Sequence, residues 1–250
     1  MSTQSNSTDG GGAPQAFPRT RWSLVLAARE RSSPEAAAAL EAVCGAYWYP
    51  IYAYVRRRGQ AQHDAQDITQ EFFRRLLEHH WLERVDREKG RLRAFLIGAL
   101  KHFMAKEWRR ASAAKRGGGQ FHLPMDTAFA ESRYAADANA RSGADELFDR
   151  QWALRLLELT MEQLQAEFQA AGKAGEFEVL KRFLTVTHAA LNYQTVAEQL
   201  GVSEGSARVS VHRLRRRFRE LYRQEILQTL PDGADLDAEL RHLANALARS

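Results

Sequence analysis

The side chains best suited to chemistry are the arginines of a segment near the C-terminus. Seven of them lie between positions 208 and 223, where Glu220 is the only acid. They are Arg208, Arg213, Arg215, Arg216, Arg217, Arg219 and Arg223. Guanidinium groups stay charged and donate paired hydrogen bonds to phosphate, so these residues favour binding of a polyanion rather than catalysis. The alternative is a charged helix that only faces solvent.

Residues 192–223 predict two helices joined by a tight turn, which would position these arginines. Asn192 and Ser203 are residue types that cap helix N-termini, and Gly201 suits a helix end that needs a positive φ. Apolar residues at helical spacing then predict one buried stripe on the second helix. The stripe consists of Ala207, Val211, Leu214, Phe218 and Leu221. This layout is typical of a helix-turn-helix, whose second helix enters the major groove of DNA.

A second group of cations lies in the first half of the chain. It consists of Lys101, Lys106, Arg109, Arg110, Lys115 and Arg116. Trp108 stands among them, and a helix that mixes cations with aromatic rings suits single-stranded nucleic acid, because cations neutralise phosphates and rings stack on unpaired bases. A core tryptophan beside a solvated basic face explains the same residues equally well.

Composition supports an acidic partner and narrows the remaining classes. The 250 residues carry a formal net charge of +5, and the pI of about 9.5 favours a polyanion as partner. Cys44 is the only cysteine, so an intrachain disulfide and a cysteine-based zinc site are excluded. Residues 1–18 lack an apolar run, and no stretch approaches 18 apolar residues, so we expect a cytoplasmic protein without signal peptide or membrane span.

The composition shifts along the chain predict an all-α protein of two helical modules joined by a flexible linker. The predicted segments are a disordered 1–18, a first helical block 19–116, a linker 117–150, a second helical block 151–230 and a C-terminal helical extension 231–250. The linker opens with Gly117–Gly119 and continues with small and polar residues. The extension carries an apolar stripe of Leu236, Leu240, Leu243 and Leu247, which we expect to pack on the second module.

Four helices are predicted in the first block. They are Trp22–Arg31, a helix from Pro34 to about Arg58, a helix that begins near His63–Asp64, and a helix over about 92–113. Pro34 suits a first helical position, Pro50 predicts a kink and Gly59 predicts an end. In the third helix we expect Ile68, Phe72, Leu76 and Leu77 to face inward.

Three of these segments resemble a known family. Residues 64–77 (DAQDITQEFFRRLL) resemble region 2.2 of bacterial RNA polymerase sigma factors of the extracytoplasmic-function (ECF) type. Residues 90–110 resemble regions 2.3 and 2.4, and residues 193–218 resemble region 4.2. The order of the motifs and the linker between them also match. The resemblance covers about 20–230 and implies a non-catalytic specificity subunit that directs promoter recognition, DNA melting and transcription initiation.

The resemblance also implies roles for particular residues. Those expected to bind core polymerase, at the β′ coiled coil, are Asp67, Gln70, Glu71 and Phe72. Those expected at the −10 element are Arg91, Arg93, Lys101, Lys106, Trp108, Arg109 and Arg110. Those expected to read the −35 element or hold its phosphates are Glu204, Gly205, Ser206, Arg208, Val209, His212, Arg213, Arg216 and Arg217. The implied partners are core RNA polymerase, through its β′ coiled coil and β flap, promoter DNA and an anti-sigma factor, without cofactor or metal.

Two other classes of function stay open. A stand-alone helix-turn-helix regulator would explain 192–223 but not 64–77, and a helical interaction protein would explain the first block but not the arginines. The extension 231–250 either packs on the fold or inhibits the chain's own activity. Enzyme signals are weak, because His63–Asp64 and His79–His80 lack metal-site spacing and Gly117–Gly119 lacks the rest of a phosphate loop.

Overall fold

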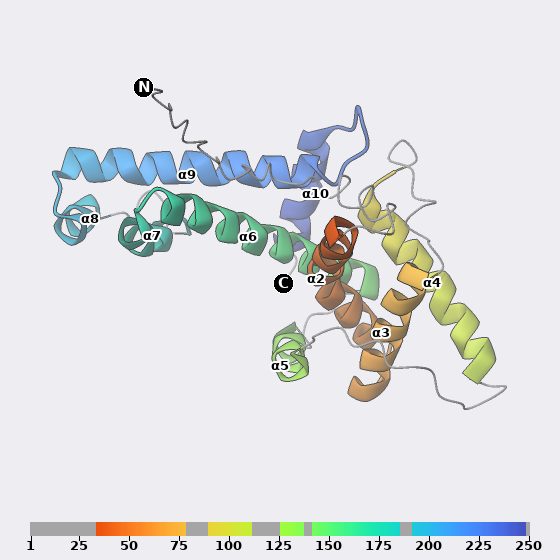
Figure 1. Ribbon diagram of the computed structural model, residues 1–250. Helices are drawn as coiled ribbons and strands as arrows, with labels where there is room; N and C mark the ends of the chain where they lie inside the picture. Colours follow the sequence, from red (N-terminus) through yellow and green to blue (C-terminus); the bar gives the residue numbers. More distant parts are fainter. Residues whose placement is uncertain (1–33, 79–89, 112–125, 138–141, 186–191, 249–250) are drawn as a thin grey trace, which may run out of the picture.

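The computed structural model describes residues 34–78, 90–111, 126–137, 142–185 and 192–248. Within these ranges all regular secondary structure is helical, which confirms the all-α prediction for the part of the chain described. The predicted helix Trp22–Arg31 and the predicted disordered segment 1–18 lie outside these ranges. Figure 1 shows a cluster of helices at one end and a long two-helix arm that extends from it.

Helix α2 (Pro34–Arg57) is the centre of the clustered end. Consecutive residues from Tyr49 to Val55 are buried, so this part of the helix is covered on every side rather than along one stripe. The helix ends before Gly59, whose φ of 92° is a conformation that favours glycine. Pro50 lies inside the helix, as the sequence predicts.

Helices α3 (Gln62–Glu78) and α4 (Leu92–Ala111) pack against α2. Phe72 and Leu76 of α3 are buried as predicted, whereas Ile68 and Leu77 are half-buried. The buried face of α3 is completed by Ala65, Thr69 and Phe73. Phe72 contacts Phe103 of α4, with ring centroids 5.9 Å apart.

The segment predicted to be a flexible linker, 117–150, contains two helical stretches. Helix α5 (Thr127–Asp137) lies in its middle, and α6 (Ala144–Ala170) begins before its end. Leu147 and Phe148 of α6 are buried in the same cluster as α2. Small and polar residues suggested a linker, but apolar residues at helical spacing give α6 a face that is buried against α2. The domain boundaries themselves stay a prediction.

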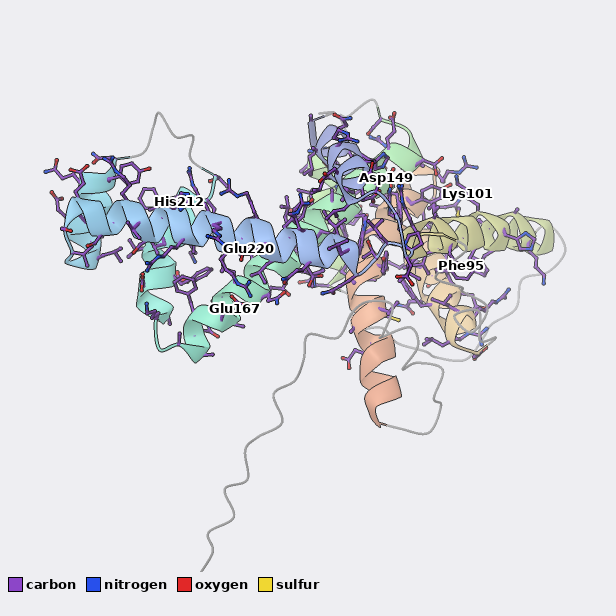
Figure 2. The ribbon with its side chains drawn as sticks, turned by 90° about the horizontal axis from the view of Figure 1, so that it is seen from above. Phe95, Lys101, Asp149, Glu167, His212 and Glu220 are labelled. Atoms are coloured by element: carbon purple, nitrogen blue, oxygen red, sulfur yellow. The ribbon has the colours of Figure 1, made fainter. Side chains whose placement is uncertain are left out.

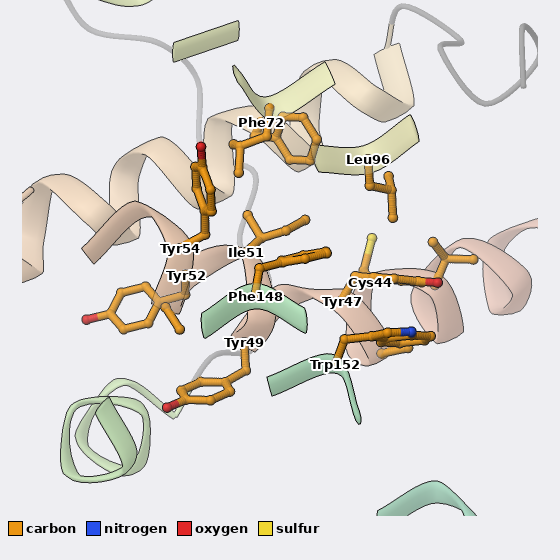
Figure 3. Close-up of a cluster of buried hydrophobic side chains, with 14 of the residues drawn as sticks. Cys44, Tyr47, Tyr49, Ile51, Tyr52, Tyr54, Phe72, Leu96, Phe148 and Trp152 are labelled. Carbon is orange, nitrogen blue, oxygen red and sulfur yellow. The ribbon is translucent and has the colours of Figure 1, made fainter. Parts of the chain in front are cut away.

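Figure 3 shows how α6 joins this cluster. The Trp152 ring stacks on Tyr47 of α2 at a centroid distance of 4.3 Å and an interplanar angle of 12°, and both side chains are fully buried. Such stacking adds to the free energy gained by burying two large rings. The first half of α6 is therefore a part of the hydrophobic core around α2.

The two-helix arm is formed by α6 and α9 (Glu204–Leu227), which run side by side in opposite directions. At the far end of the arm lie α7 (Ala174–Leu180), a 3₁₀ turn (Lys181–Phe183) and α8 (Tyr193–Leu200). A second hydrophobic cluster fills this end. It comprises Leu164, Phe177, Leu180, Val196, Ala197, Ala207, Val211, Leu214 and Leu221.

Helix α10 (Leu236–Ala248) carries the predicted leucine stripe. Leu243 is fully buried, and Leu236, Leu240 and Leu247 are partly buried around it. The stripe contacts α6 and α9 but belongs to the cluster around α2, not to the cluster at the far end of the arm. The contacts with α6 and α9 agree with the prediction that the extension packs on the second module. They lie where these two helices join the cluster around α2.

Candidate nucleic-acid interface

The turn between α8 and α9 has the geometry predicted from its sequence. The Asn192 side chain accepts a hydrogen bond from the Thr195 backbone N–H at 3.2 Å. Gly201 adopts a left-handed conformation with φ 66°, and Ser203 Oγ accepts from the Ser206 N–H at 3.2 Å. These contacts satisfy backbone groups that helix ends leave without partners. The two caps and the turn at Gly201 therefore form as predicted. The assignment of these helices to a DNA-binding helix-turn-helix stays a prediction.

The buried stripe of α9 also matches its prediction. Ala207, Val211, Leu214 and Leu221 are buried, and Phe218 is partly buried beside them. Because these residues hold one face of α9 against α8, α7 and α6, the opposite face of the first three turns is left to solvent. The exposed residues on this part of the helix are Glu204, Gly205, Ser206, Arg208, Val209, His212 and Arg213. All seven were predicted to meet the −35 element.

Arg208 is held in place by two neighbours. Its guanidinium pairs with Glu204 one turn earlier at 3.1 Å, and it lies 4.9 Å from the centre of the Tyr193 ring. The Arg208 side chain is 63% exposed, so its guanidinium is accessible from solvent while the helix stays packed. Exposed pairs of this kind are weak, because water screens them.

The two predicted phosphate contacts further along α9 are engaged within the chain. Arg216 pairs with Glu220 at 2.8 Å but remains 72% exposed. Arg217 makes two hydrogen bonds to Glu167 of α6, at 2.6 and 2.8 Å. The hydrogen bonds to Glu167 raise the pKa of Arg217 above its ordinary value. Arg217 thus ties α9 to α6, a role that the sequence did not indicate; Figure 2 shows where Glu167 and Glu220 lie along the arm.

A hollow along α9 adds residues that the sequence prediction left out. Its lining combines Arg208, His212 and Arg216 with Tyr193 of α8 and with Arg219. Arg219 is exposed and lies on the same helix face as His212 and Arg216. This spacing could have predicted Arg219 from the sequence. Arg215, by contrast, donates to the Phe183 backbone oxygen at 2.7 and 2.9 Å and holds the 3₁₀ turn.

The predicted polymerase-binding residues divide between the surface and the core of α3. Asp67 is 66% exposed, and the one basic side chain within 4 Å of it among the described residues is His63, at 3.6 Å. Glu71 is partly exposed and accepts from Arg74 and Arg75, each at 2.6 Å. The hydrogen bond from Arg74 lowers the pKa of Glu71. The hydrogen bond from Arg75 also lowers it, by less, whereas partial burial of the carboxylate raises it.

Phe72 corrects the prediction for this surface. Its side chain is fully buried among the aromatic rings of the core, so it offers no exposed apolar contact to a partner. The burial of Phe72 agrees with the inward orientation predicted from helical spacing, not with the exposed contact that the family pattern implies. Gln70 is half-buried, so the accessible part of the site is Asp67 with the edges of Gln70 and Glu71.

Three of the residues predicted to bind the −10 element are cations that each pair with an acidic side chain. Arg91 pairs with Glu239 at 2.9 Å, and Lys101 pairs with Asp145 at 2.7 Å. Arg93 is 6% exposed and pairs with Glu239 at 3.0 Å and with Asp149. The hydrogen bond to Asp145 raises the pKa of Lys101.

The remaining −10 candidates lie toward the end of α4. Lys106 is exposed there. Trp108, Arg109 and Arg110 fall within the helix, but their side chains lie outside the described part of the structure. The question whether Trp108 is a core residue or stacks on bases therefore stays a prediction.

Other kinds of site find no support among the described residues. No group of three His, Cys, Asp or Glu side chains there is arranged to hold a metal ion. None of the helices in the described ranges is long and apolar enough to span a lipid bilayer. Gly117–Gly119 and His79–His80 lie outside those ranges. Cys44 is buried, and burial together with the charge of Glu41 raises the pKa of its thiol to about 12, which disfavours the thiolate that a nucleophilic cysteine needs.

Comparison with protein families gives a match to part of the chain. Residues 47–114 match the model of sigma-70 region 2, a span that runs from the second half of α2 through α3 and α4. Comparisons with curated proteins and with solved structures gave no match. The match supports a member of the sigma-70 family, whose members are non-catalytic specificity subunits that bind core RNA polymerase and promoter DNA. The match does not extend to α8 and α9, so their assignment to a helix-turn-helix rests on the sequence and on the capped turn between them.

Proposed function

With a sigma-70 region 2 at residues 47–114, we propose that this chain is a sigma factor of the ECF type, which binds core RNA polymerase and directs initiation at its own promoters. The observation that carries the proposal is the presence, on one chain and in this order, of the region 2 match and a capped helix-turn-helix with a cationic outer face. A region 2 alone would leave the second part of the chain without a role.

The surface proposed for core polymerase is the solvent-facing side of α3. Asp67 and Glu71 provide carboxylate oxygens and Gln70 an amide, which suit basic side chains of the β′ coiled coil. Phe72 is buried, and its packing in the core fixes which face of α3 is exposed to the polymerase. The helix-turn-helix end of the chain is proposed to contact the β flap.

The −10 element is proposed to bind along α4. Extruding a base from duplex DNA costs a few kcal/mol of stacking and pairing. Exposed Lys106 and the cations that follow it would hold the phosphates of the displaced strand, and Trp108 would stack on an unpaired base. Trapping of extruded bases stabilises the open state, so the proposed melting step needs no nucleotide hydrolysis.

The −35 element is proposed to meet the first turns of α9. Arg208, Val209 and His212 point to solvent from the part of the helix that enters the major groove in helix-turn-helix proteins. An arginine that pairs with guanine supplies about 1–3 kcal/mol of discrimination. Arg213, Arg216 and Arg219 would contact phosphates, which position the protein without reading sequence.

The main rival is a stand-alone helix-turn-helix regulator, and binding to core RNA polymerase separates the two. Purified chain and bacterial core polymerase are mixed and run on gel filtration at moderate salt. A stable one-to-one complex is expected. The double variant Asp67→Ala/Gln70→Ala should lose the complex, whereas Glu78→Ala, an acid about 16 Å further along the same helix, should keep it. Absence of any complex with the wild-type chain, together with tight binding to duplex DNA alone, would favour the rival.

A further inference from the structure

Three of the cations that the sigma-factor resemblance places at the −10 element pair with acids from other parts of the chain. Arg91, Arg93 and Lys101 lie within the region 2 match, whereas their partners Asp145, Asp149 and Glu239 all lie outside it. Asp145 and Asp149 come from the start of α6, and Glu239 comes from α10. Figure 2 shows Lys101 and Asp149 at the same end of the molecule.

Glu239 is the centre of this arrangement. Its side chain is only 1% exposed, and its two carboxylate oxygens form ion pairs with Arg91 at 2.9 Å and with Arg93 at 3.0 Å. His242, one turn later on α10, contacts Asp149 at 2.9 Å and Arg93 at 3.3 Å. A buried carboxylate persists only when cations and hydrogen bonds compensate for its lost hydration. Glu239 therefore depends on the same guanidinium groups that a phosphate would need.

The rest of α10 holds Glu239 in place through apolar packing. Leu243 is fully buried one turn beyond Glu239, and Leu240 and Leu247 pack around it. Asp237 on the outer side pairs with Arg223 at 3.2 Å, where both side chains are about half exposed or more. Arg93 cannot reach a nucleic-acid strand while α10 is docked, because this helix and α6 leave only 6% of it exposed.

We propose that α10, with Glu239, is an internal cover that occupies the place of DNA phosphates on Arg91 and Arg93 and must leave before these arginines bind a single strand. The proposal rests on the proposed sigma function, because the resemblance to sigma factors places both arginines at the −10 element. The covered state is the one described here; the open state exchanges a carboxylate for phosphates on the same donors. Asp145 of α6 pairs with Lys101, but both side chains of that pair remain about half exposed or more.

Binding of a fluorescent 20-nucleotide oligo-dT to the full-length chain, measured by anisotropy over a series of salt concentrations, tests the cover without knowledge of the promoter. Glu239→Gln should bind more tightly than wild type. The slope of log affinity against log salt should steepen by about 0.7 for each newly neutralised phosphate, and thus by about 1.4 for two arginines. Asp237→Asn removes the same charge from the same helix but touches neither arginine, and it should leave the slope unchanged.

A double variant tests whether the steeper salt dependence of Glu239→Gln depends on the freed arginines. Arg91→Ala combined with Glu239→Gln should lose about half of the added slope, because one of the two freed cations is gone. Equal slopes for Glu239→Gln, Asp237→Asn and wild type would overturn the proposal. Equal steepening by both single variants would do so too, since it would reflect net charge alone.

Hydrogen exchange on the wild-type chain provides a measurement that does not depend on a variant's folding. When core polymerase and the oligonucleotide are added, the amides of Leu236–Ala248 should lose protection as α10 leaves. Unchanged protection while the DNA is bound would overturn the cover. Failure of the sigma proposal looks different: no complex with core polymerase forms, yet Glu239→Gln still steepens the salt dependence.

Discussion

Replacing Trp152 by alanine tests whether α6 belongs to the core around α2. The Trp152 ring is fully buried and stacked on Tyr47, so the change removes a large apolar surface and leaves a cavity that the surrounding helices fill only in part. Truncation of a buried tryptophan costs about 3–5 kcal/mol. This is a large fraction of the roughly 5–15 kcal/mol by which a folded domain is stable.

The measurement is urea unfolding followed by far-ultraviolet circular dichroism. With a urea dependence of about 3 kcal/mol per molar, a loss of about 4 kcal/mol lowers the midpoint by about 1.3 M. Trp152→Phe keeps a stacked ring and should lose clearly less. Phe129→Ala, which removes a ring that is 57% exposed on α5, should stay within about 0.5 kcal/mol of wild type.

The shape of the transition carries a second test. Helix α6 contributes Trp152 to one hydrophobic cluster and Leu164 to the other, so damage at Trp152 should weaken both in one cooperative transition. If Trp152→Ala cost less than about 1 kcal/mol, the described packing of α6 on α2 would be refuted. Two separate transitions, with only the first one shifted, would instead favour the flexible linker that the sequence predicted.

Three further predictions concern single groups. Ser203→Ala removes the cap of α9 and should lower the free energy of unfolding by about 1 kcal/mol, whereas Ser203→Asp should retain most of it; thermal unfolding measures both. Because burial keeps Cys44 protonated, it should react with a thiol reagent at pH 8 only after urea unfolds the chain, and rapid labelling of the native chain would contradict its placement. Arg74 lowers the pKa of Glu71 below its ordinary value of 4.5, so the ionised carboxylate stabilises the fold at pH values above 4.5. This stabilisation is lost as the pH falls through the lowered pKa. Glu71→Gln should therefore lose less stability than wild type between pH 7 and pH 3. An equal loss in both chains would show that Glu71 contributes nothing to it.

Local features were predictable where a few neighbouring residues decide the conformation. The caps at Asn192 and Ser203 and the left-handed Gly201 depend only on contacts within three or four positions, so residue types indicated them. The stripe of α9 was equally clear, because its spacing is set by the helix itself. The inward position of Phe72 followed from the same spacing, although the family pattern suggested an exposed role for it.

Pairings between distant segments were not predictable in this way. Arg217 was expected to bind phosphate, and only the packing of α9 beside α6 shows that Glu167 holds it. Arg93 was expected on the surface, yet α10 and α6 bring Glu239 and Asp149 to it across 146 and 56 positions of sequence. No local pattern marks such partners, because any exposed acid is a candidate until the fold selects one.

The sequence by itself determined the helical class and the caps and turn between α8 and α9, since these depend on spacing and on residues that lie close together in the chain. Only the tertiary structure decided that α5 and the start of α6 occupy the predicted linker, and that α10 reaches the core around α2. Burial of one helix against another depends on the shape and charge of both surfaces at once. The same packing that buries Trp152 and Leu243 also determines which of the chain's cations are free to meet a partner.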